Sequence, residues 1–141
     1  MWRVWWIKGN YRRKLNMHVL EVFGRIFLSS IFLIAGINKI LNFEMTVEYM
    51  ESFSVPKYLL IPAIIVEILF PILIIIGYKT KISALIMTLF TIALAIIFHT
   101  DFTNQMQLMS FLKNFAIAGG FIIIFVNGPN KCSIDYQLKS N

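Results

Sequence analysis

The chain has 141 residues, of which 58% are hydrophobic and only 14% are charged. A soluble domain averages about 25% charged and about 45–50% apolar residues, so the composition indicates a single-domain integral membrane protein and excludes a soluble catalytic domain. The formal net charge of +6 is concentrated in a few loops, which argues against nucleic-acid binding.

The first segment, residues 1–19, is basic and aromatic (MWRVWWIKGNYRRKLN), which is typical of an interfacial anchor. It is not a cleavable signal peptide, because the first apolar run is long enough to span a membrane and no small-residue cleavage site follows it. Met17 is an alternative start for the protein, in which case the residues before it would be an extension of the gene model.

Four apolar segments follow, at residues 20–41, 58–78, 82–99 and 108–126. A helix needs about 20 residues to cross a hydrocarbon core of about 30 Å. Backbone groups in lipid must be hydrogen-bonded within the segment, so each span is predicted to be a helix. Short connections make neighbouring helices antiparallel. The sequence therefore predicts an all-α, up-down bundle of four transmembrane helices, followed by a tail at residues 127–141.

The charges between these segments predict the topology. Basic residues precede the first span, fill the turn between the second and third spans, and follow the fourth: Arg3, Lys8, Arg12, Arg13, Lys14, Lys79, Lys81, Lys131 and Lys139. Acidic residues dominate the other two loops: Glu44, Glu48, Glu51 and Asp101. Because cationic loops stay in the cytoplasm, both termini are predicted to be cytoplasmic (N-in/C-in), with affinity for anionic lipid headgroups.

Polar residues inside the first two spans require partners. Glu21 and Arg25 are spaced i, i+4 and predict a structural ion pair near the cytoplasmic end of the first span. The second span carries one ionisable residue, Glu67, near its centre. An unpaired charge at this depth costs about 3 kcal/mol on insertion scales, so Glu67 must find a donor or stay protonated. The available donors are Lys39, near the outer end of the first span, and Lys113 in the fourth.

The third and fourth spans add polar residues at a similar depth. Lys39, His99, Lys113 and Asn114 all lie within about two helical turns of the outer leaflet if the spans alternate in direction, with Glu67 somewhat deeper. We therefore predict a polar pocket in the outer half of the bundle. In this pocket Lys113 meets Glu67, and Asn114 adds a hydrogen bond across the bundle. The alternative interpretation is that a buried Glu–Lys pair only fixes the register of the helices.

The same residues limit the chemistry. His18 and His99 are predicted on opposite sides of the bilayer, so they cannot both ligate one haem. Cys132 is the only cysteine, and no metal-ligand spacing, phosphate loop or nucleophilic triad is present. The sequence predicts no intrinsic cofactor and no metal site, and it leaves enzyme activity open, at most as an oxidoreductase subunit. A diffusible quinone is the natural redox partner, because Lys113, His99 and Glu67 could supply the hydrogen bonds and proton carrier that its carbonyls need.

Three stretches carry a family resemblance: EVFGRIFLSSIFLIAGINKILNF, then HTDF with QMQLMSFLKNFAIAGG, then GPNKCSID. They extend over residues 20–135 and resemble the DoxX family of small bacterial membrane proteins. The resemblance implies a multi-pass, four-helix protein of the bacterial inner membrane. The family takes its name from a subunit of an archaeal thiosulfate:quinone oxidoreductase, and other members are linked to membrane oxidoreductase complexes and oxidative-stress responses. The retained motif residues are Gly24, Arg25, Gly36, Lys39, Glu67, His99, Lys113, Asn114, Gly119, Gly120, Ser133 and Asp135.

Residues and resemblance together favour an accessory subunit of a quinone-linked membrane redox complex. A structural or assembly factor for partner membrane proteins is one alternative, which the small-residue helix faces favour. A small-solute or proton-coupled transporter is another, which the single membrane carboxylate of Glu67 favours. The expected partners are the lipid bilayer and other membrane or redox subunits; a homodimer stays open, and nucleic acid is excluded.

Overall fold

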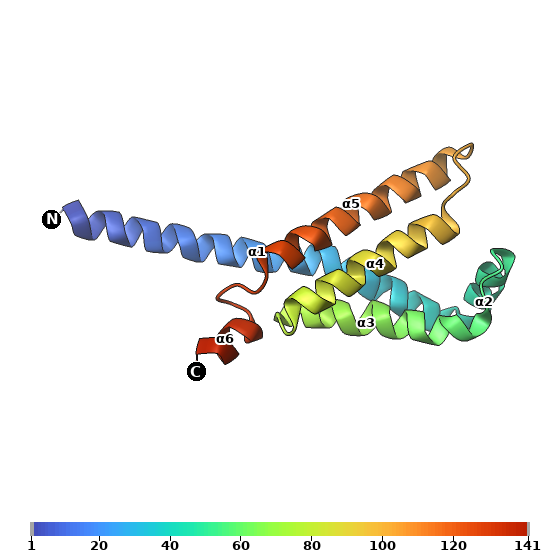
Figure 1. Ribbon diagram of the computed structural model, residues 1–141, viewed down its shortest axis with the longest axis horizontal. Helices are drawn as coiled ribbons and strands as arrows, with labels where there is room; N and C mark the ends of the chain where they lie inside the picture. Colours follow the sequence, from blue (N-terminus) through green and yellow to red (C-terminus); the bar gives the residue numbers. More distant parts are fainter. Residues whose placement is uncertain (1, 141) are drawn as a thin grey trace.

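The computed structural model describes the backbone of residues 2–140 and the side chains of residues 17–139. Within these residues the regular structure is entirely helical: α1 (Trp2–Leu41), α2 (Phe43–Ser52), the short 3-10 turn η1 (Lys57–Leu59), α3 (Leu60–Ile76), α4 (Thr80–Phe98), α5 (Gln105–Asn127) and α6 (Ile134–Ser140) (Figure 1). Four segments are long and apolar enough to cross a membrane, namely Met17–Leu41, Lys57–Ile76, Thr80–Phe98 and Gln105–Asn127. The predicted all-α fold with four spanning helices is confirmed, and each span lies within about one turn of its predicted limits.

The predicted N-terminal extension, residues 1–19, is continuous with the first span, because α1 runs through both without a break. The side chains of residues 1–16 lie outside the described residues. The role of this segment as an interfacial anchor, and Met17 as an alternative start, therefore stay predictions.

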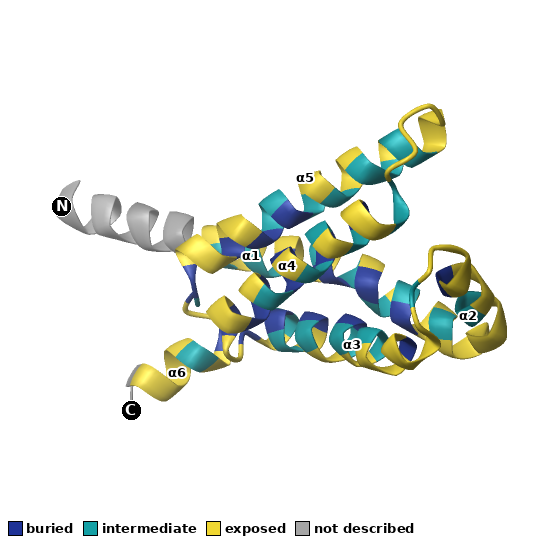
Figure 2. Ribbon diagram, turned by 45° about the vertical axis from the view of Figure 1, so that its right-hand side comes forward, coloured by how far each residue is buried: buried dark blue, intermediate teal, exposed yellow. Residues whose placement is uncertain are grey.

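The four spanning helices form two antiparallel pairs. α1 packs along α3, α4 packs along α5, and α3 connects to α4 through a tight turn at residues 77–79. The two pairs converge where α6 lies and diverge toward α2, so the molecule has the shape of a V (Figures 1 and 2). We name these two ends the α6 end and the α2 end. The assignment of the α6 end to the cytoplasm stays a prediction from loop charge.

The hydrophobic core lies where the two pairs converge. Phe32 of α1, Met87 of α4 and Phe121 of α5 are buried there, and the ring centroids of Phe32 and Phe121 are 5.6 Å apart. The helices approach closely because Gly120 has no side chain: a Cβ at this position would lie 3.1 Å from Leu28. One face of α4 carries small and hydroxyl side chains, which suit close helix packing, and it is buried: Ala84, Thr88, Thr91 and Ala95.

Hydrogen bonds between the tail and the α3–α4 turn hold the α6 end together. Gly77 ends α3 with a positive φ of 71°, and its carbonyl accepts a hydrogen bond from the Asp135 N–H at 3.0 Å. A Cβ on Gly77 would lie 2.3 Å from that of Ser133, so only glycine fits. The Asp135 carboxylate accepts from the backbone N–H groups of Lys79 and Thr80, both at 2.8 Å, and from the Thr80 hydroxyl at 2.9 Å, so it caps α4 from a distant part of the chain. Partial burial acts to raise the pKa of Asp135, but these hydrogen bonds together hold it below its ordinary value.

Arg25 attaches α1 to the same end. Its side chain is buried, and Nη2 donates to Glu21 Oε1 at 2.5 Å and to the Gly128 carbonyl at 3.0 Å. The predicted i, i+4 pair of Glu21 and Arg25 therefore forms. It also connects α1 to the residue that ends α5.

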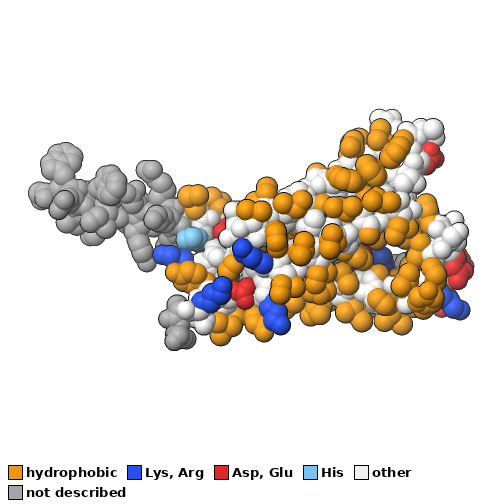
Figure 3. All heavy atoms as spheres, in the orientation of Figure 1, with side chains coloured by type: hydrophobic (Ala, Val, Ile, Leu, Met, Phe, Trp, Pro, Cys, Tyr) orange, Lys and Arg blue, Asp and Glu red, His pale blue; other side chains and the backbone are white. Residues whose placement is uncertain are grey.

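Apolar side chains cover the outside of the spanning helices. Figure 3 shows them over α3, α4 and α5, with the charged side chains visible on this face gathered toward the two ends. Leu85, Leu89 and Ile96 of α4 and Ile122 and Ile123 of α5 are all exposed. A continuous apolar surface of this extent is rare on a soluble monomer, and it is the surface that lipid would cover.

Candidate functional site

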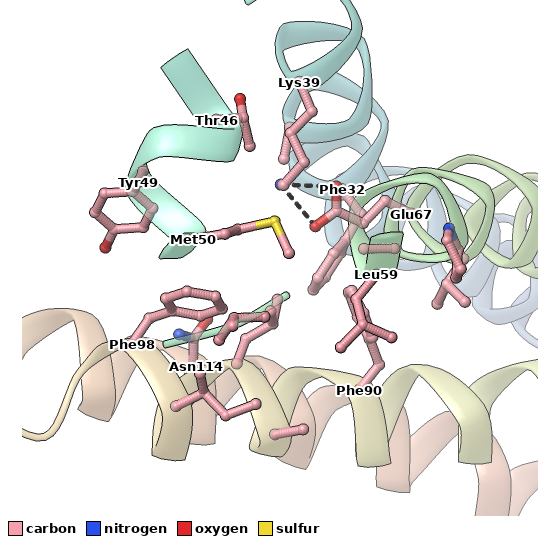
Figure 4. Close-up of a pocket in the computed structure, with 18 of the residues that line it drawn as sticks. Phe32, Lys39, Thr46, Tyr49, Met50, Leu59, Glu67, Phe90, Phe98 and Asn114 are labelled. Carbon is pink, nitrogen blue, oxygen red and sulfur yellow. Dashed lines mark hydrogen bonds and ion pairs between the residues drawn. The ribbon is translucent and has the colours of Figure 1, made fainter. Parts of the chain in front are cut away.

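A cavity of about 540 Å³ lies between the two helix pairs at the α2 end. α1, α3 and α4 supply most of its walls, α5 adds one residue, and α2 covers its end. Most of the lining is apolar. The polar lining residues are Lys39, Thr46, Tyr49, Glu67, His99 and Asn114, all but His99 labelled in Figure 4.

Lys39 and Glu67 form an ion pair in the cavity wall. Lys39 Nζ donates to both carboxylate oxygens of Glu67, each at 2.8 Å (Figure 4). The Glu67 side chain is only 1% exposed, whereas that of Lys39 is 25% exposed. A buried carboxylate is costly unless it is paired, so Lys39 supplies the compensating charge.

Gly36 allows this pair to form. A Cβ at Gly36 would lie 2.9 Å from Ile68 Cγ1 and 3.3 Å from Glu67 Cβ, so glycine lets α1 and α3 approach closely. Lys39 follows Gly36 by one turn, on the side of α1 that faces α3. An ammonium group has three N–H donors, and Glu67 takes two of them, which leaves one for another acceptor.

His99 lines the cavity at the C-terminal end of α4. Its Nδ1 lies 2.7 Å from Gln107 Oε1 of α5. An amide oxygen only accepts hydrogen bonds, so with the amide in this orientation the proton is on Nδ1 and Nε2 is free to accept. The sequence pattern indicated His99 as a site residue, but nothing in it indicated that Gln107 orients the His99 ring.

Lys113 does not meet Glu67, contrary to the prediction. It is exposed and does not line the cavity. Within the described part of the chain, neither Lys113 nor Asn114 forms an ion pair or a hydrogen bond with Glu67. The reason is the divergence of the two pairs, which carries α5 away from α3 while Lys39 stays on a helix packed against it. The structure therefore brings Lys39, Glu67, His99 and Asn114 to one cavity and leaves Lys113 outside it.

The sequence did not indicate α2 as an element of the site, because residues 42–57 lack an apolar run of spanning length and were expected to be a connection between two spans. Met50 of α2 is buried against the cavity. The ring of Tyr49 stacks on Phe98 with centroids 5.6 Å apart, and the ring of Phe53 lies 5.3 Å from Phe98. We name these three rings the aromatic clasp; they join α2 to the end of α4 across the mouth of the V. The i, i+4 spacing of Tyr49 and Phe53 was the available signal. Burial raises the pKa of the Tyr49 phenol, so its hydroxyl stays protonated.

The cavity has the properties of a small-molecule site. Such sites enclose about 300–1,000 Å³, are mostly apolar, and carry a few polar groups that fix the ligand's orientation. Here the polar groups are an ammonium with one free donor, an imidazole, an amide and a phenol. Among the residues that the structure describes, no group of three or more His, Cys, Asp and Glu is placed to hold a metal ion. The arrangement can bind an apolar ring or chain and hydrogen-bond oxygen atoms on it.

Comparison with known proteins identifies the relatives of the chain. The DoxX family model matches residues 20–100, which include Lys39, Glu67 and His99. Two Escherichia coli (strain K12) proteins are similar: inner membrane protein YqjF is 35% identical over 115 residues (82% of this chain and 88% of YqjF), and inner membrane protein YphA is 35% identical over 124 residues (83% and 89%). No solved structure matches. The chain therefore belongs to the DoxX family and, with its four apolar spanning helices, is a multi-pass protein of the inner membrane.

Proposed function

We propose that the protein is an accessory subunit of a membrane redox complex and that its cavity binds a quinone. The observation that supports this proposal is the Lys39–Glu67 ion pair in the wall of a largely apolar cavity between membrane-spanning helices. The apolar lining suits the quinone ring and the first part of its prenyl tail. The free N–H of Lys39 suits a ring carbonyl.

The ion pair also suits the charge that develops when a quinone is reduced. Reduction to the quinol takes two electrons, which a redox partner would supply, and two protons. Electron transfer places negative charge on the quinone oxygens, and the ammonium of Lys39 would stabilise it there. Glu67 holds the ammonium of Lys39 in place through two hydrogen bonds, and the imidazole of His99 lies in the same cavity.

The test is quinone retention by the full chain, purified in mild detergent and equilibrated with decylubiquinone. Ala63→Phe should abolish retention, because Ala63 lines the cavity and the new ring would fill it. The matched control is Ile65→Phe, since Ile65 lies exposed on the same helix and should retain quinone. Equal retention by both variants, or none by the wild type, would count against the proposal.

Two other functions predict different results. An assembly factor would use the Lys39–Glu67 pair only to hold α1 against α3, so it would retain a stable protein partner and bind no quinone. A transporter would use Glu67 as a proton or solute carrier in the cavity, so Glu67→Gln would abolish flux in liposomes. The ratio of apolar to polar lining residues favours quinone binding over both.

A further inference from the structure

α2 and the loop that follows it form the end wall of the cavity. Four residues of this segment line the cavity: Thr46, Tyr49, Met50 and Val55. The side chain of Met50 is only 6% exposed and points into the cavity (Figure 4). The segment is therefore a part of the site and not only a connection between α1 and α3.

The two faces of α2 differ in character. Helical residues separated by three, four or seven positions lie on one face. Three exposed glutamates share such a face: Glu44, Glu48 and Glu51. The residues that line the cavity or belong to the aromatic clasp lie about half a turn away, on the opposite face of α2 and its C-cap: Thr46, Tyr49, Met50 and Phe53. α2 thus has a charged outer face and a mainly apolar face toward the cavity.

Apolar contacts attach α2 to the helices around it. Among the described residues, every hydrogen bond made between Asn42 and Val55 has its partner within residues 38–55, and this segment forms no ion pair. Its attachment to α4 is the aromatic clasp. The C-terminal α6, by contrast, is held to the α3–α4 turn by three hydrogen bonds to the Asp135 carboxylate. Displacement of α2 would therefore break ring contacts but no hydrogen bond to another helix, which is typical of a segment that opens locally.

The backbone at the two ends of α2 suits a pivoting movement. Asn42 interrupts the helix between α1 and α2, with φ −120° and ψ 48°. Ser54, just after the C-cap, has a φ of 60°, in the left-handed region that a residue with a side chain enters at a cost. Hinges are usually a few residues at the ends of an element that take up a large change in φ and ψ. Asn42 and Ser54 have this position.

We propose that α2 is a lid over the cavity, that it pivots at Asn42 and Ser54, and that the aromatic clasp holds it closed. In the closed state Met50 fills one end of the cavity and the three glutamates face outward. In the open state a ligand enters or leaves the cavity at the α2 end. The inference rests on the proposed function only in taking the cavity as a binding site, and it does not require that the ligand is a quinone.

Opening of the lid is measured without a ligand, by the rate at which a charged maleimide labels Met50→Cys in a Cys132→Ser background. The full chain is used in mild detergent, and thermal unfolding verifies that each variant is folded. Met45 lies on the same helix and is 67% exposed, so Met45→Cys is the reference for an unprotected thiol. We expect Met50→Cys to react at least about tenfold more slowly than Met45→Cys, because it reacts only when α2 opens.

Phe53→Ala loosens the aromatic clasp without changing the cavity wall. Phe53 has ring contacts with Tyr49 and Phe98, at 5.1 Å and 5.3 Å between centroids, but it does not line the cavity. In this variant Met50→Cys should react about tenfold faster, as expected for the loss of two aromatic pairs.

The matched control is Phe102→Ala. It removes a ring contact of the same kind, 5.1 Å from Phe111, in the connection between α4 and α5, so it should leave the labelling of Met50→Cys unchanged. Three results would overturn the lid: equal labelling of Met45→Cys and Met50→Cys, no acceleration by Phe53→Ala, or equal acceleration by Phe53→Ala and Phe102→Ala.

Ligand exchange is measured with decylubiquinone bound to the full chain in phosphatidylcholine nanodiscs. Phe53→Ala should speed its release about tenfold, and Phe102→Ala should not. Faster labelling of Met50→Cys without faster release would overturn the role of α2 in ligand exchange.

The outcomes separate this inference from the proposed function. A protein that retains decylubiquinone but fails the labelling test loses the lid and keeps quinone binding. If the wild type binds no decylubiquinone, the quinone of the proposed function is removed, and the labelling rates alone decide whether α2 opens.

Discussion

Replacing Lys39 with methionine should leave Glu67 buried without its partner. Methionine keeps an unbranched side chain of similar length and lacks the ammonium group. At a separation of 2.8 Å, the two charges attract by about 6 kcal/mol at an effective dielectric constant of about 20. Dehydration of the two ions offsets most of this attraction, so the intact pair contributes little net stability. The variant keeps the dehydration of the carboxylate and loses the attraction.

Proton uptake by the carboxyl group limits the cost. For a glutamate with an ordinary pKa of about 4.3, protonation at pH 7 costs about 3.7 kcal/mol, and about 1.4 kcal/mol less for each unit of lower pH. We therefore expect Lys39→Met to lower the free energy of unfolding by about 3–4 kcal/mol at pH 7 and by less than about 2 kcal/mol at pH 5.5. The stability of the variant rises as the pH falls, because the folded variant binds one proton more than its unfolded state.

The assay is thermal unfolding in detergent, followed by circular dichroism between pH 5.5 and 7.5. The midpoint of Lys39→Met should lie about 10 °C or more below the wild type at pH 7. The double variant with Glu67→Gln should recover most of that loss, because no charge is left unpaired. The matched control is Lys113→Met, an exposed lysine in a spanning helix, which should change stability by less than about 0.5 kcal/mol.

Two results would refute this reasoning. One is a loss in Lys39→Met that does not depend on pH, since it would mean that the protonation of Glu67 does not set the cost. The other is an equal loss in Lys113→Met, since it would mean that removal of any lysine from a span has the same effect.

Other positions give local tests. Gly77→Ala should lower stability by about 2 kcal/mol or more in thermal unfolding, because its φ is 71° and the new Cβ would collide with the tail, whereas Gly119→Ala should cost nothing. The folded-state pKa of Asp135 is lowered, so the stability that its carboxylate contributes is complete above about pH 4 and is lost as the pH falls below that value. The unfolding midpoint of the wild type should therefore fall below about pH 4. The midpoint of Asp135→Asn should already be lower than that of the wild type at neutral pH and should not show this further fall. Phe98→Ala removes two ring contacts of the aromatic clasp, so hydrogen exchange should become faster in α2 and stay unchanged in α6; equal exchange in α2 would contradict a closing role.

The spans were predictable because the bilayer fixes the length and apolarity of each one. The need of Glu67 for a charged partner was also predictable from its depth in the membrane. That the partner is Lys39 and not Lys113 was not predictable, because it depends on the divergence of the two helix pairs. The packing of the helices depends on close fits such as Gly36 against α3 and Gly120 against α1, and a single glycine in a sequence does not reveal which helix it faces.

The parts outside the spans were harder to predict for a different reason. α2 is short and contains both charged and aromatic residues, so its sequence does not show the apolar run that marks a span. Asp135 caps α4 from 55 positions away, and no local pattern indicates a cap at that separation. Both elements depend on tertiary contacts that form only after the spans have packed.

The turn at residues 77–79 is the one place where the chain passes from the first helix pair to the second, and α6 is hydrogen-bonded to that turn. α4 extends from this turn for 19 residues, a lever of about 28 Å. A rotation of about 10° at the turn would displace the far end of α4 by about 5 Å, close to the width of an aromatic ring. Such a rotation would change the spacing of the two helix pairs at the α2 end, so the hydrogen bonds between α6 and this turn would bear on the width of the cavity although α6 contributes no residue to its wall.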